Sequence, residues 1–297
     1  MLCIITQQTV AQVLNSHTTQ QLTSLQADSL SPFYEQWKPL GRILESEGWY
    51  VWCVAPIYGQ DGKVHVFYSR WKASKGMGGW LRGSEIAHAV ADKPEGPYRF
   101  VETVLAPRPG YWDATTCHNP HIHYLDGRYY LFYMGNSNGK TNTKRIGVAT
   151  APSVYGPWTR YDHPLGPYVK VKENPLINYS VFGQNRQVED AFIWVENHRF
   201  HLLMRDMGFF NHTVGLYSTS DDGLTWSLPS KAWKGLAEYI REPQPPTYLK
   251  RYGRLERPQL LMKDGHPAYL FTATQGGRYG TASGFVLQLI PTHGNTD

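Results

Sequence analysis

The stretch DGKVHVFY at residues 61–68 decides the fold, because it joins a tight-turn signal to a run of apolar and aromatic residues. Asp-Gly pairs favour the two-residue turns of β-hairpins, and β-branched and aromatic residues favour strands. The pattern returns as DGRYYLFY at 126–133, NHRFHLLM at 197–204 and DGHPAYLF at 264–271. The four copies begin 65, 71 and 67 residues apart. This spacing predicts a repeat architecture in which each unit contains one such hairpin.

A second segment follows each of the first three hairpins: a strand of small residues, a turn with glycine, and a strand opened by an aromatic residue. These segments span 85–98, 145–158 and 215–226, and the fourth copy is shortened to GFVLQL at 284–289. Two hairpins make a four-stranded antiparallel sheet, and radial repetition of such sheets makes a β-propeller. The repeat therefore predicts blades over 49–104, 116–161, 187–228 and 255–290.

We therefore expect an all-β fold, a five-bladed β-propeller of four-stranded antiparallel blades. Residues 26–48 and the C-terminal strand are expected to supply the fifth blade and close the ring. One domain would then span 26–297, and a polar N-terminal arm or helix would occupy 1–25. A length of 297 residues suits an undivided propeller. The aromatic share of 14% suits either an all-β core or a sugar-binding surface.

Charge and apolar patterning exclude several classes of protein. The net charge of +5 comes from scattered Lys and Arg, so we expect no nucleic-acid partner. No apolar run approaches eighteen residues, so we expect no membrane span. The three cysteines (Cys3, Cys53 and Cys117) are odd in number and widely spaced, which indicates neither a disulfide framework nor a zinc site. The apolar start, Met1–Ile5, is too short for a secretory signal, which leaves the compartment open.

Functional side chains are expected where the innermost strands begin, because these positions face the central channel of a propeller. The four segments there are WCVAP (52–56), CHNPH (117–121), VEDAF (188–192) and LERPQ (255–259). Three of them place charged or polar residues directly before an apolar strand. Glu, Asp and Arg are rarely buried without a partner or a purpose. The set is therefore either a group of ion pairs that ties the blades together or a functional site.

The four-fold pattern resembles the five-bladed propeller glycoside hydrolases, the broad group of families 43, 32, 68 and 117. In VEDAFIW (188–194) the resemblance implies that Glu189 is the general acid. Two motifs depart from the family pattern. Asn119, in HNPH (118–121), stands where the second-blade Asp is expected, and Ala55-Pro56 stands where the first blade carries an Asp-Pro with the base.

Those departures matter because glycoside hydrolysis usually needs two carboxyl groups, one to protonate the leaving oxygen and one to activate water or attack the sugar. The base is then expected elsewhere. Asp113, in a loop before the second-blade strand, and Glu256, at the fourth-blade strand start, are the candidates. Asp190 is a further candidate, although in a regular strand it would face away from Glu189. This chemistry requires no cofactor, and the sequence leaves open whether a structural or catalytic metal ion sits in the central channel.

Further residues are candidates for binding substrate: His118, Asn119, His121, Arg186, Arg257, Trp52 and Trp112. Arg186 and Arg257 could hold the carboxylate of an acidic sugar through bidentate contacts, and salt bridges to Glu189 or Glu256 explain them equally well. The tryptophans are candidate platforms for sugar rings. His121-x-His123 puts two imidazoles on one strand face, but this is a weak signal and assigns no metal ligands.

The sequence thus predicts a glycoside hydrolase that acts on a plant or algal oligo- or polysaccharide. Its partner would be the carbohydrate substrate, and the N-terminal arm offers a route to a homo-oligomer. A non-catalytic carbohydrate-binding propeller is the alternative, because the first-blade Asp is missing and Asn119 replaces the second. Lyase or phosphorolytic chemistry on the same scaffold stays open, since fold does not determine function.

Overall fold

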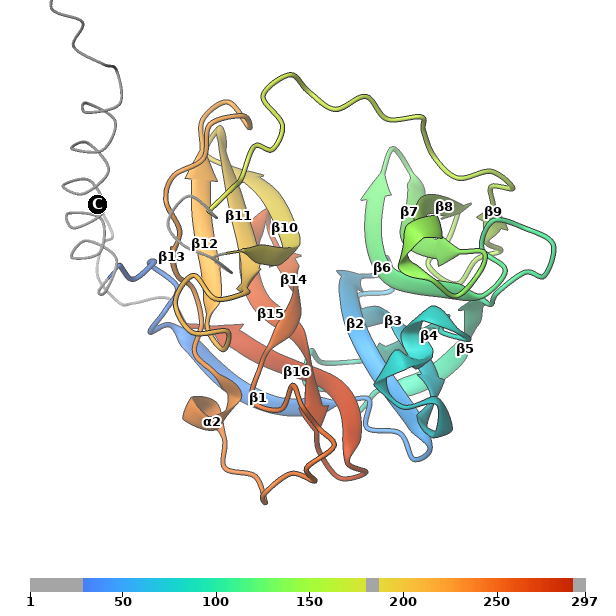
Figure 1. Ribbon diagram of the computed structural model, residues 1–297, viewed down its shortest axis with the longest axis horizontal. Coiled ribbons are helices and arrows are strands. Elements are labelled where there is room, and N and C mark those ends of the chain that lie inside the picture. Colours follow the sequence, from blue (N-terminus) through green and yellow to red (C-terminus); the bar gives the residue numbers. More distant parts are fainter. Residues whose placement is uncertain (1–28, 180–186, 291–297) are drawn as a thin grey trace, which may run out of the picture.

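The computed structural model describes residues 29–179 and 187–290 of the chain. Within these residues it is an all-β protein of sixteen strands in three sheets. Figure 1 shows how the strands are arranged. The arm expected at 1–25 and the candidate residue Arg186 lie outside the described residues. The division into one domain stays a prediction.

The strands form four groups of four, each of which follows the predicted repeat. The first group is β2 (Trp49–Tyr58), β3 (Val64–Lys72), β4 (Glu85–Ala91) and β5 (Arg99–Leu105). The second is β6 (Thr116–Leu125), β7 (Arg128–Asn136), β8 (Arg145–Ala151) and β9 (Thr159–Arg160). The third is β10 (Val188–Glu196), β11 (Arg199–Asp206), β12 (Gly215–Ser220) and β13 (Ser230–Lys231). The fourth is β14 (Glu256–Lys263), β15 (His266–Gly276), β16 (Thr281–Leu289) and β1 (Trp37–Ile43).

The place of β1 differs from the expectation for residues 26–48. This strand pairs antiparallel with β16, from Trp37 opposite Leu289 to Ile43 opposite Gly284, and so completes the fourth group. Two strands far apart in the sequence are thereby joined in one sheet. A separate fifth blade built from 26–48 and the C-terminal strand is not confirmed, because these two segments pair with each other within the fourth blade.

The first and fourth groups form a single eight-stranded sheet, because β16 also makes a parallel contact with β2 at Ala282 and Tyr50. The other strand pairs described are antiparallel. Apolar side chains fill the spaces between neighbouring blades, as where Phe67 of the first group packs with Leu131 of the second. Burial of such side chains stabilises the fold by about 25 cal/mol per Å² of apolar surface.

Helices are few and short in the described part of the chain: η1 (Ala73–Lys75), η2 (Met77–Leu81), η3 (Thr141–Thr143) and α2 (Leu236–Tyr239). No helix within 29–179 and 187–290 is long and apolar enough to cross a membrane. After β9 the segment 161–179 runs across the top of Figure 1. The innermost strands β2, β6, β10 and β14 surround the centre, where they line a cavity of about 360 Å³.

Candidate active site

Each innermost strand carries a β-bulge near its start. The pairing register is interrupted between Trp52 and Val54, His118 and His121, Glu189 and Phe192, and Glu256 and Gln259. One residue in each interruption has a left-handed backbone; these bulge residues are Cys53, Asn119, Asp190 and Arg257, with φ of 47°, 53°, 62° and 58°. Non-glycine residues rarely adopt this conformation, and bulges commonly redirect side chains at functional sites.

The four bulge residues line one cavity of about 270 Å³, which we call the channel-end cavity. Its other lining residues are Pro120, His121, Ala191, Pro258 and Gln259. Four segments spaced evenly along the chain therefore meet at one point, as the sequence analysis predicted for the starts of the innermost strands.

The bulges alter two expectations. In a regular strand Asp190 would lie on the face opposite Glu189, but the left-handed turn at Asp190 brings it to the cavity wall. The first-blade residue that corresponds to Asn119 is Cys53, and not Ala55, which is 1% exposed. Burial raises the pKa of the Cys53 thiol to about 12, so this position carries a neutral thiol at neutral pH.

Asp190 and Arg257 form an ion pair on the wall of the channel-end cavity. Nη1 of Arg257 lies 2.7 Å from Oδ1 of Asp190, and the backbone N–H of Arg257 donates to Oδ2 at 3.2 Å. Within the described residues Arg257 forms no ion pair with Glu189 or Glu256, the two partners expected from the sequence, because its guanidinium is paired with Asp190. Two buried polar atoms of cavity-lining residues, Nε of Arg257 and Oδ1 of Asn119, have no hydrogen-bond partner. Two residues of the cavity wall thus keep unused hydrogen-bonding capacity, one as a donor and one as an acceptor.

Glu189 and Glu256 share the guanidinium of Arg205, a residue of β11 that the sequence analysis missed. Nη1 of Arg205 lies 3.1 Å from Oε2 of Glu189 and 3.1 Å from Oε2 of Glu256. The two carboxylate oxygens are therefore no farther apart than twice that distance. A buried arginine within the apolar run HLLMRD (201–206) was the available signal, because an arginine 2% exposed requires a partner.

The environments of these two carboxyl groups differ sharply. The Glu189 side chain is 50% exposed, whereas that of Glu256 is 2% exposed and makes a second ion pair, with Nη1 of Arg251 at 3.3 Å. Burial raises the pKa of Glu256, against the opposing effect of Arg205 and Arg251. Glu189 is thus the carboxyl group that a molecule in solution can reach.

The two candidate histidines are neutral near pH 7. His121 lines the channel-end cavity and stacks on Phe192, with ring centroids 5.3 Å apart. Burial, and then the neighbouring His123, lower the pKa of His121 to about 4. His118 is 2% exposed, and its Nδ1 lies 2.9 Å from Oγ of Ser84. Burial and then Arg257 lower the pKa of His118 well below its usual value.

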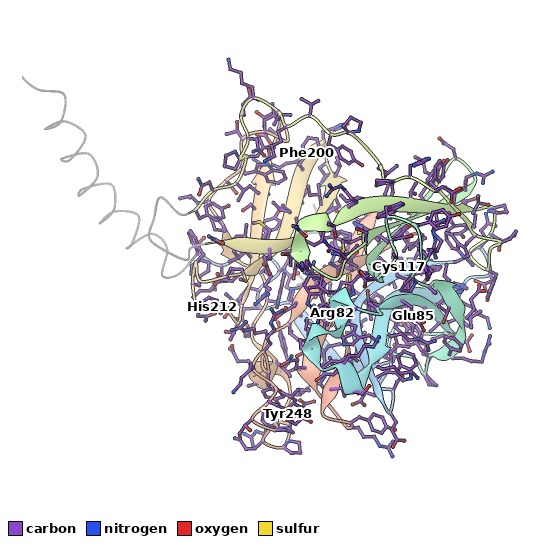
Figure 2. All side chains as sticks on the ribbon, turned by 45° about the vertical axis from the view of Figure 1, so that its right-hand side comes forward. Arg82, Glu85, Cys117, Phe200, His212 and Tyr248 are labelled. Carbon is purple, nitrogen blue, oxygen red and sulfur yellow. The ribbon has the colours of Figure 1, made fainter. Side chains whose placement is uncertain are left out.

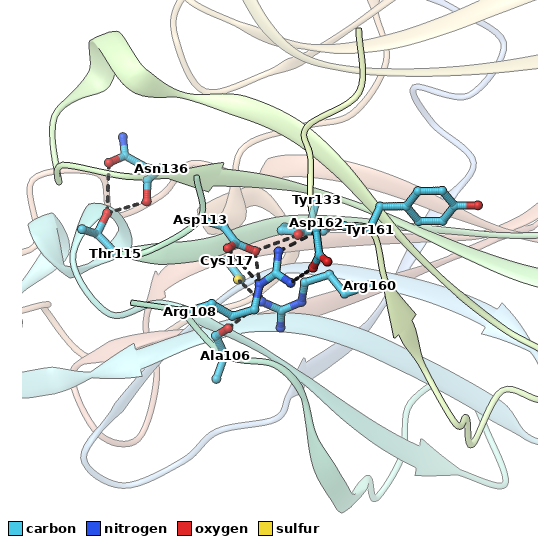
Figure 3. A network of polar contacts seen from close by, with 10 residues as sticks. All are labelled: Ala106, Arg108, Asp113, Thr115, Cys117, Tyr133, Asn136, Arg160, Tyr161 and Asp162. Atoms are coloured by element: carbon cyan, nitrogen blue, oxygen red, sulfur yellow. Dashed lines mark hydrogen bonds and ion pairs between the residues drawn. The ribbon is translucent and has the colours of Figure 1, made fainter. Parts of the chain in front are cut away.

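Asp113 lies in a different environment, which Figure 3 shows. Its side chain is fully buried and does not line the channel-end cavity. Arg108 donates to Oδ1 at 3.1 Å, while Tyr133 and Arg160 donate to Oδ2 at 2.8 Å and 3.0 Å. These groups come from the segment after β5, from β7 and from β9. The arrangement suits an anchor for the second blade and leaves no open side at which Asp113 could activate water.

The two candidate tryptophans are also packed against protein. Trp52 is 2% exposed within an apolar cluster that includes Tyr50 and Trp71. Trp112 stacks on Tyr133, with ring centroids 5.4 Å apart, and covers Gly147 of β8. Neither indole presents a free face to the channel-end cavity. Within the described residues, no group of three or more His, Cys, Asp or Glu side chains could hold a metal ion.

Comparison with known proteins finds carbohydrate-active enzymes among those similar to this chain. No family model matches the chain. A segment of 136 residues, 42% of the chain, is 34% identical to a protein of Aspergillus fumigatus described as probable arabinan endo-1,5-alpha-L-arabinosidase C, of which it covers 39%. A protein of Neosartorya fischeri with the same description is 38% identical over 104 residues, 31% of either chain. The matches thus span well under half of these relatives.

Solved structures match over most of the chain. A family 117 glycoside hydrolase from Zobellia galactanivorans has a TM-score of 0.56 and 14% identity, over 88% of this chain and 91% of that one. A family 43 β-xylosidase/α-arabinofuranosidase from a compost metagenome, solved with xylotriose in a calcium-free form, has a TM-score of 0.54 and 13% identity, over 89% and 96%. The fold is therefore that of the propeller glycoside hydrolases, as the sequence resemblance implied.

Proposed function

We propose that this protein is a glycoside hydrolase that cleaves plant or algal oligo- or polysaccharides at the channel-end cavity. The observation that carries the proposal is the convergence of three carboxyl groups, Glu189, Asp190 and Glu256, at the starts of β10 and β14. Glycoside hydrolysis needs two carboxyl groups in different environments. The relatives named for arabinan and xylo-oligosaccharide hydrolysis support the same class of substrate.

In this proposal Glu189 is the general acid, because it is the exposed member of the three and a leaving-group oxygen can reach it. Asp190 is the base, because it is the one carboxylate on the wall of the channel-end cavity. Glu256 is buried behind them and acts through Arg205, whose position it fixes from the other side. Asn119 and Arg257 would hold sugar hydroxyl groups through Oδ1 and Nε.

The test is release of reducing sugar from a panel of plant and marine oligosaccharides by wild type, Glu189→Gln and Asp190→Asn. Loss of a general acid or base lowers the rate by about 10²–10⁴-fold. The matched control is Glu95→Gln, an exposed glutamate in the turn after β4, which should keep wild-type turnover. Wild-type turnover in Glu189→Gln would overturn the role of Glu189.

A carbohydrate-binding propeller without catalysis is the second candidate. One observation favours it: two of the four bulge residues, Cys53 and Asn119, carry no carboxylate. Isothermal titration of wild type with the same oligosaccharides separates the two functions. Binding without release of reducing sugar across the panel would establish the binding protein and overturn the hydrolase.

A further inference from the structure

A second and larger cavity, of about 520 Å³, lies outside the central channel on the fourth blade. Its walls come from the end of β1, the segment 242–252 before β14, and the turn 276–280 between β15 and β16. We call it the fourth-blade cavity. It opens at the same end of the blade as Glu256, because Glu256 at the start of β14 pairs with Ala273 near the end of β15. Figure 2 labels Tyr248 on its outer segment.

One wall of the fourth-blade cavity is held rigidly by Arg42. Nη2 of Arg42 donates to Oε2 of Glu242 at 2.7 Å, and the hydroxyl of Tyr252 donates to the same oxygen at 3.0 Å. The remaining donors of the guanidinium reach Oε1 of Glu242, the carbonyls of Thr274 and Gln275, and Oγ of Ser283. With all five N–H donors used, Arg42 serves as a fixed support for the Tyr252 ring.

Glycine keeps the floor of this cavity open. Gly276 and Gly277 have φ of 107° and 76°, which side chains rarely tolerate. A Cβ on Gly276 would lie 2.8 Å from Nη2 of Arg42 and 2.8 Å from the Tyr252 ring. The space beside Tyr252 therefore exists because these positions lack side chains.

The lining combines an aromatic ring and prolines with polar side chains at the rim. Tyr252 and the prolines at 243, 245 and 246 supply apolar surface. Gln244 and Arg278 are exposed, and neither side chain has a hydrogen bond or ion pair within the described residues. An apolar face with a few convergent polar groups is the usual chemistry of a small-molecule site, and a sugar ring has both an apolar C–H face and edge hydroxyls.

A single residue connects the fourth-blade cavity to the candidate acid cluster. The backbone N–H of Arg251 donates to Oε1 of Gln275 at 2.8 Å, next to Gly276 on the cavity floor. Its side chain reaches Oε2 of Glu256 at 3.3 Å. Arg251 therefore contacts both the strand end that leads to the cavity floor and the buried carboxyl group of the acid cluster. Both places lie at the same end of the fourth blade.

We propose that the fourth-blade cavity is an accessory subsite that binds a distal sugar unit of the oligosaccharide cleaved at the channel end. This inference rests on the proposed function. It assigns to the protein a preference for substrates several units long, because a short substrate cannot fill both cavities. Binding energy from a remote unit raises kcat/KM for long substrates.

The test compares wild type with the double variant Gln244→Ala/Arg278→Ala, which removes the polar rim groups and leaves Arg42, Glu242 and Tyr252 in place. The Arg278 guanidinium also lies over the Tyr279 ring, 5.5 Å from its centroid, so this contact is lost as well. Substrates are a series of oligosaccharides of increasing length and an aryl glycoside with a single sugar unit. We expect kcat/KM for the longest substrates to fall at least about tenfold, the usual effect of losing roughly 1.4 kcal/mol of binding. The value for the aryl glycoside should not change.

Two further variants sharpen this test. Tyr252→Phe keeps the ring and should retain most of the length preference, whereas Arg128→Ala, at an exposed arginine that begins β7, is the control for loss of a positive charge. Titration calorimetry of proteins that carry Glu189→Gln, with and without the double substitution, measures the affinity for the longest oligosaccharide in the absence of turnover. An unchanged length preference in the double variant of an active enzyme would overturn the subsite alone. Binding that weakens in the double variant, with no turnover in wild type, would overturn the hydrolase and support the cavity as a sugar site.

Discussion

Asp190 and Arg257, the bulge residues of two innermost strands, form an ion pair on the wall of the channel-end cavity, with Nη1 of Arg257 2.7 Å from Oδ1 of Asp190. Each lies in a backbone conformation that costs about 1–3 kcal/mol for a non-glycine residue, and the ion pair offsets part of that cost. The pair connects the third and fourth blades at the end where the proposed chemistry takes place. The same residues thus join the blades and line the cavity.

Asp190→Asn should destabilise the protein, because it leaves the Arg257 guanidinium on the cavity wall without its charged partner. The Asp190 side chain is 2% exposed and that of Arg257 30% exposed. Breaking such a pair from one side costs roughly 3 kcal/mol. Urea unfolding measures the change. The double variant Asp190→Asn/Arg257→Gln should be more stable than the sum of the single variants implies, and additive losses would contradict a direct coupling.

Asp113→Asn tests whether the second-blade network is structural. The fully buried carboxylate accepts from two arginines and a tyrosine, so its loss should lower the free energy of unfolding by roughly 3 kcal/mol. Tyr133→Phe removes one neutral donor and should cost about 1 kcal/mol. Turnover per folded molecule should stay at the wild-type value in both variants. A folded Asp113→Asn protein without turnover would restore Asp113 as the base.

The repeat was predictable from the sequence, whereas the bulges were not. Turns such as Asp61-Gly62 and the aromatic alternation after them are local signals, so the hairpins lie where the pattern predicted. A bulge is set by the pairing of two strands, and nothing in VEDAF (188–192) shows that Asp190 adopts a left-handed φ. The expectation that Asp190 would face away from Glu189 held only for a regular strand, and the bulge at Asp190 removes that condition.

The charged partners were the least predictable part of the site. Glu189, Asp190 and Glu256 were identified because carboxylates stood before apolar strands, but their partners come from elsewhere in the fold. Arg205 reaches Glu256 across 51 positions of the sequence, and no local pattern links them. The position of β1 was not predicted for a related reason. Its pairing with β16 joins residues 37–43 to residues 284–289, and no local pattern indicates a contact between segments so far apart in the sequence.

Gly147→Ala tests the packing of Trp112 on the second blade. A Cβ at Gly147 would lie 2.5 Å from the Trp112 ring and 2.9 Å from that of Tyr133, both of which are held by neighbours. Overpacking of this kind costs roughly 1–3 kcal/mol. Gly78→Ala is the control, because a Cβ there meets nothing within 4 Å, and its effect should stay within about 0.5 kcal/mol. Equal thermal stabilities of the two variants would show that the indole is free to move.

A buried histidine pair in the first blade should make the protein sensitive to acid. Nδ1 of His65 lies 2.8 Å from Nε2 of His88, and Nε2 of His65 lies 3.0 Å from Oδ1 of Asp61, whose Oδ2 accepts from Tyr155 at 2.8 Å. Burial, and then His65, lower the pKa of His88 to about 3, and burial also lowers the pKa of His65. Both imidazoles are therefore neutral in the folded protein at pH 7.

Because the folded pKa of His88 lies below its unfolded value of about 6.5, the unfolded chain takes up the proton first as the pH falls. The stability that depends on neutral His88 is complete above pH 6.5 and is lost progressively from there toward pH 3. The shift predicts a loss of roughly 2 kcal/mol by pH 5. Burial opposes the ionisation of Asp61, but hydrogen bonds from His65 and Tyr155 together outweigh it and lower the pKa of Asp61 to about 2. Protonation of Asp61 therefore lowers the stability of the folded protein further below pH 4.

Urea unfolding at pH 7 and pH 5 measures the dependence of stability on pH. His88→Gln should flatten this dependence, whereas His212→Gln, at an exposed histidine, should leave it as in wild type; equal slopes in all three proteins would contradict the assignment.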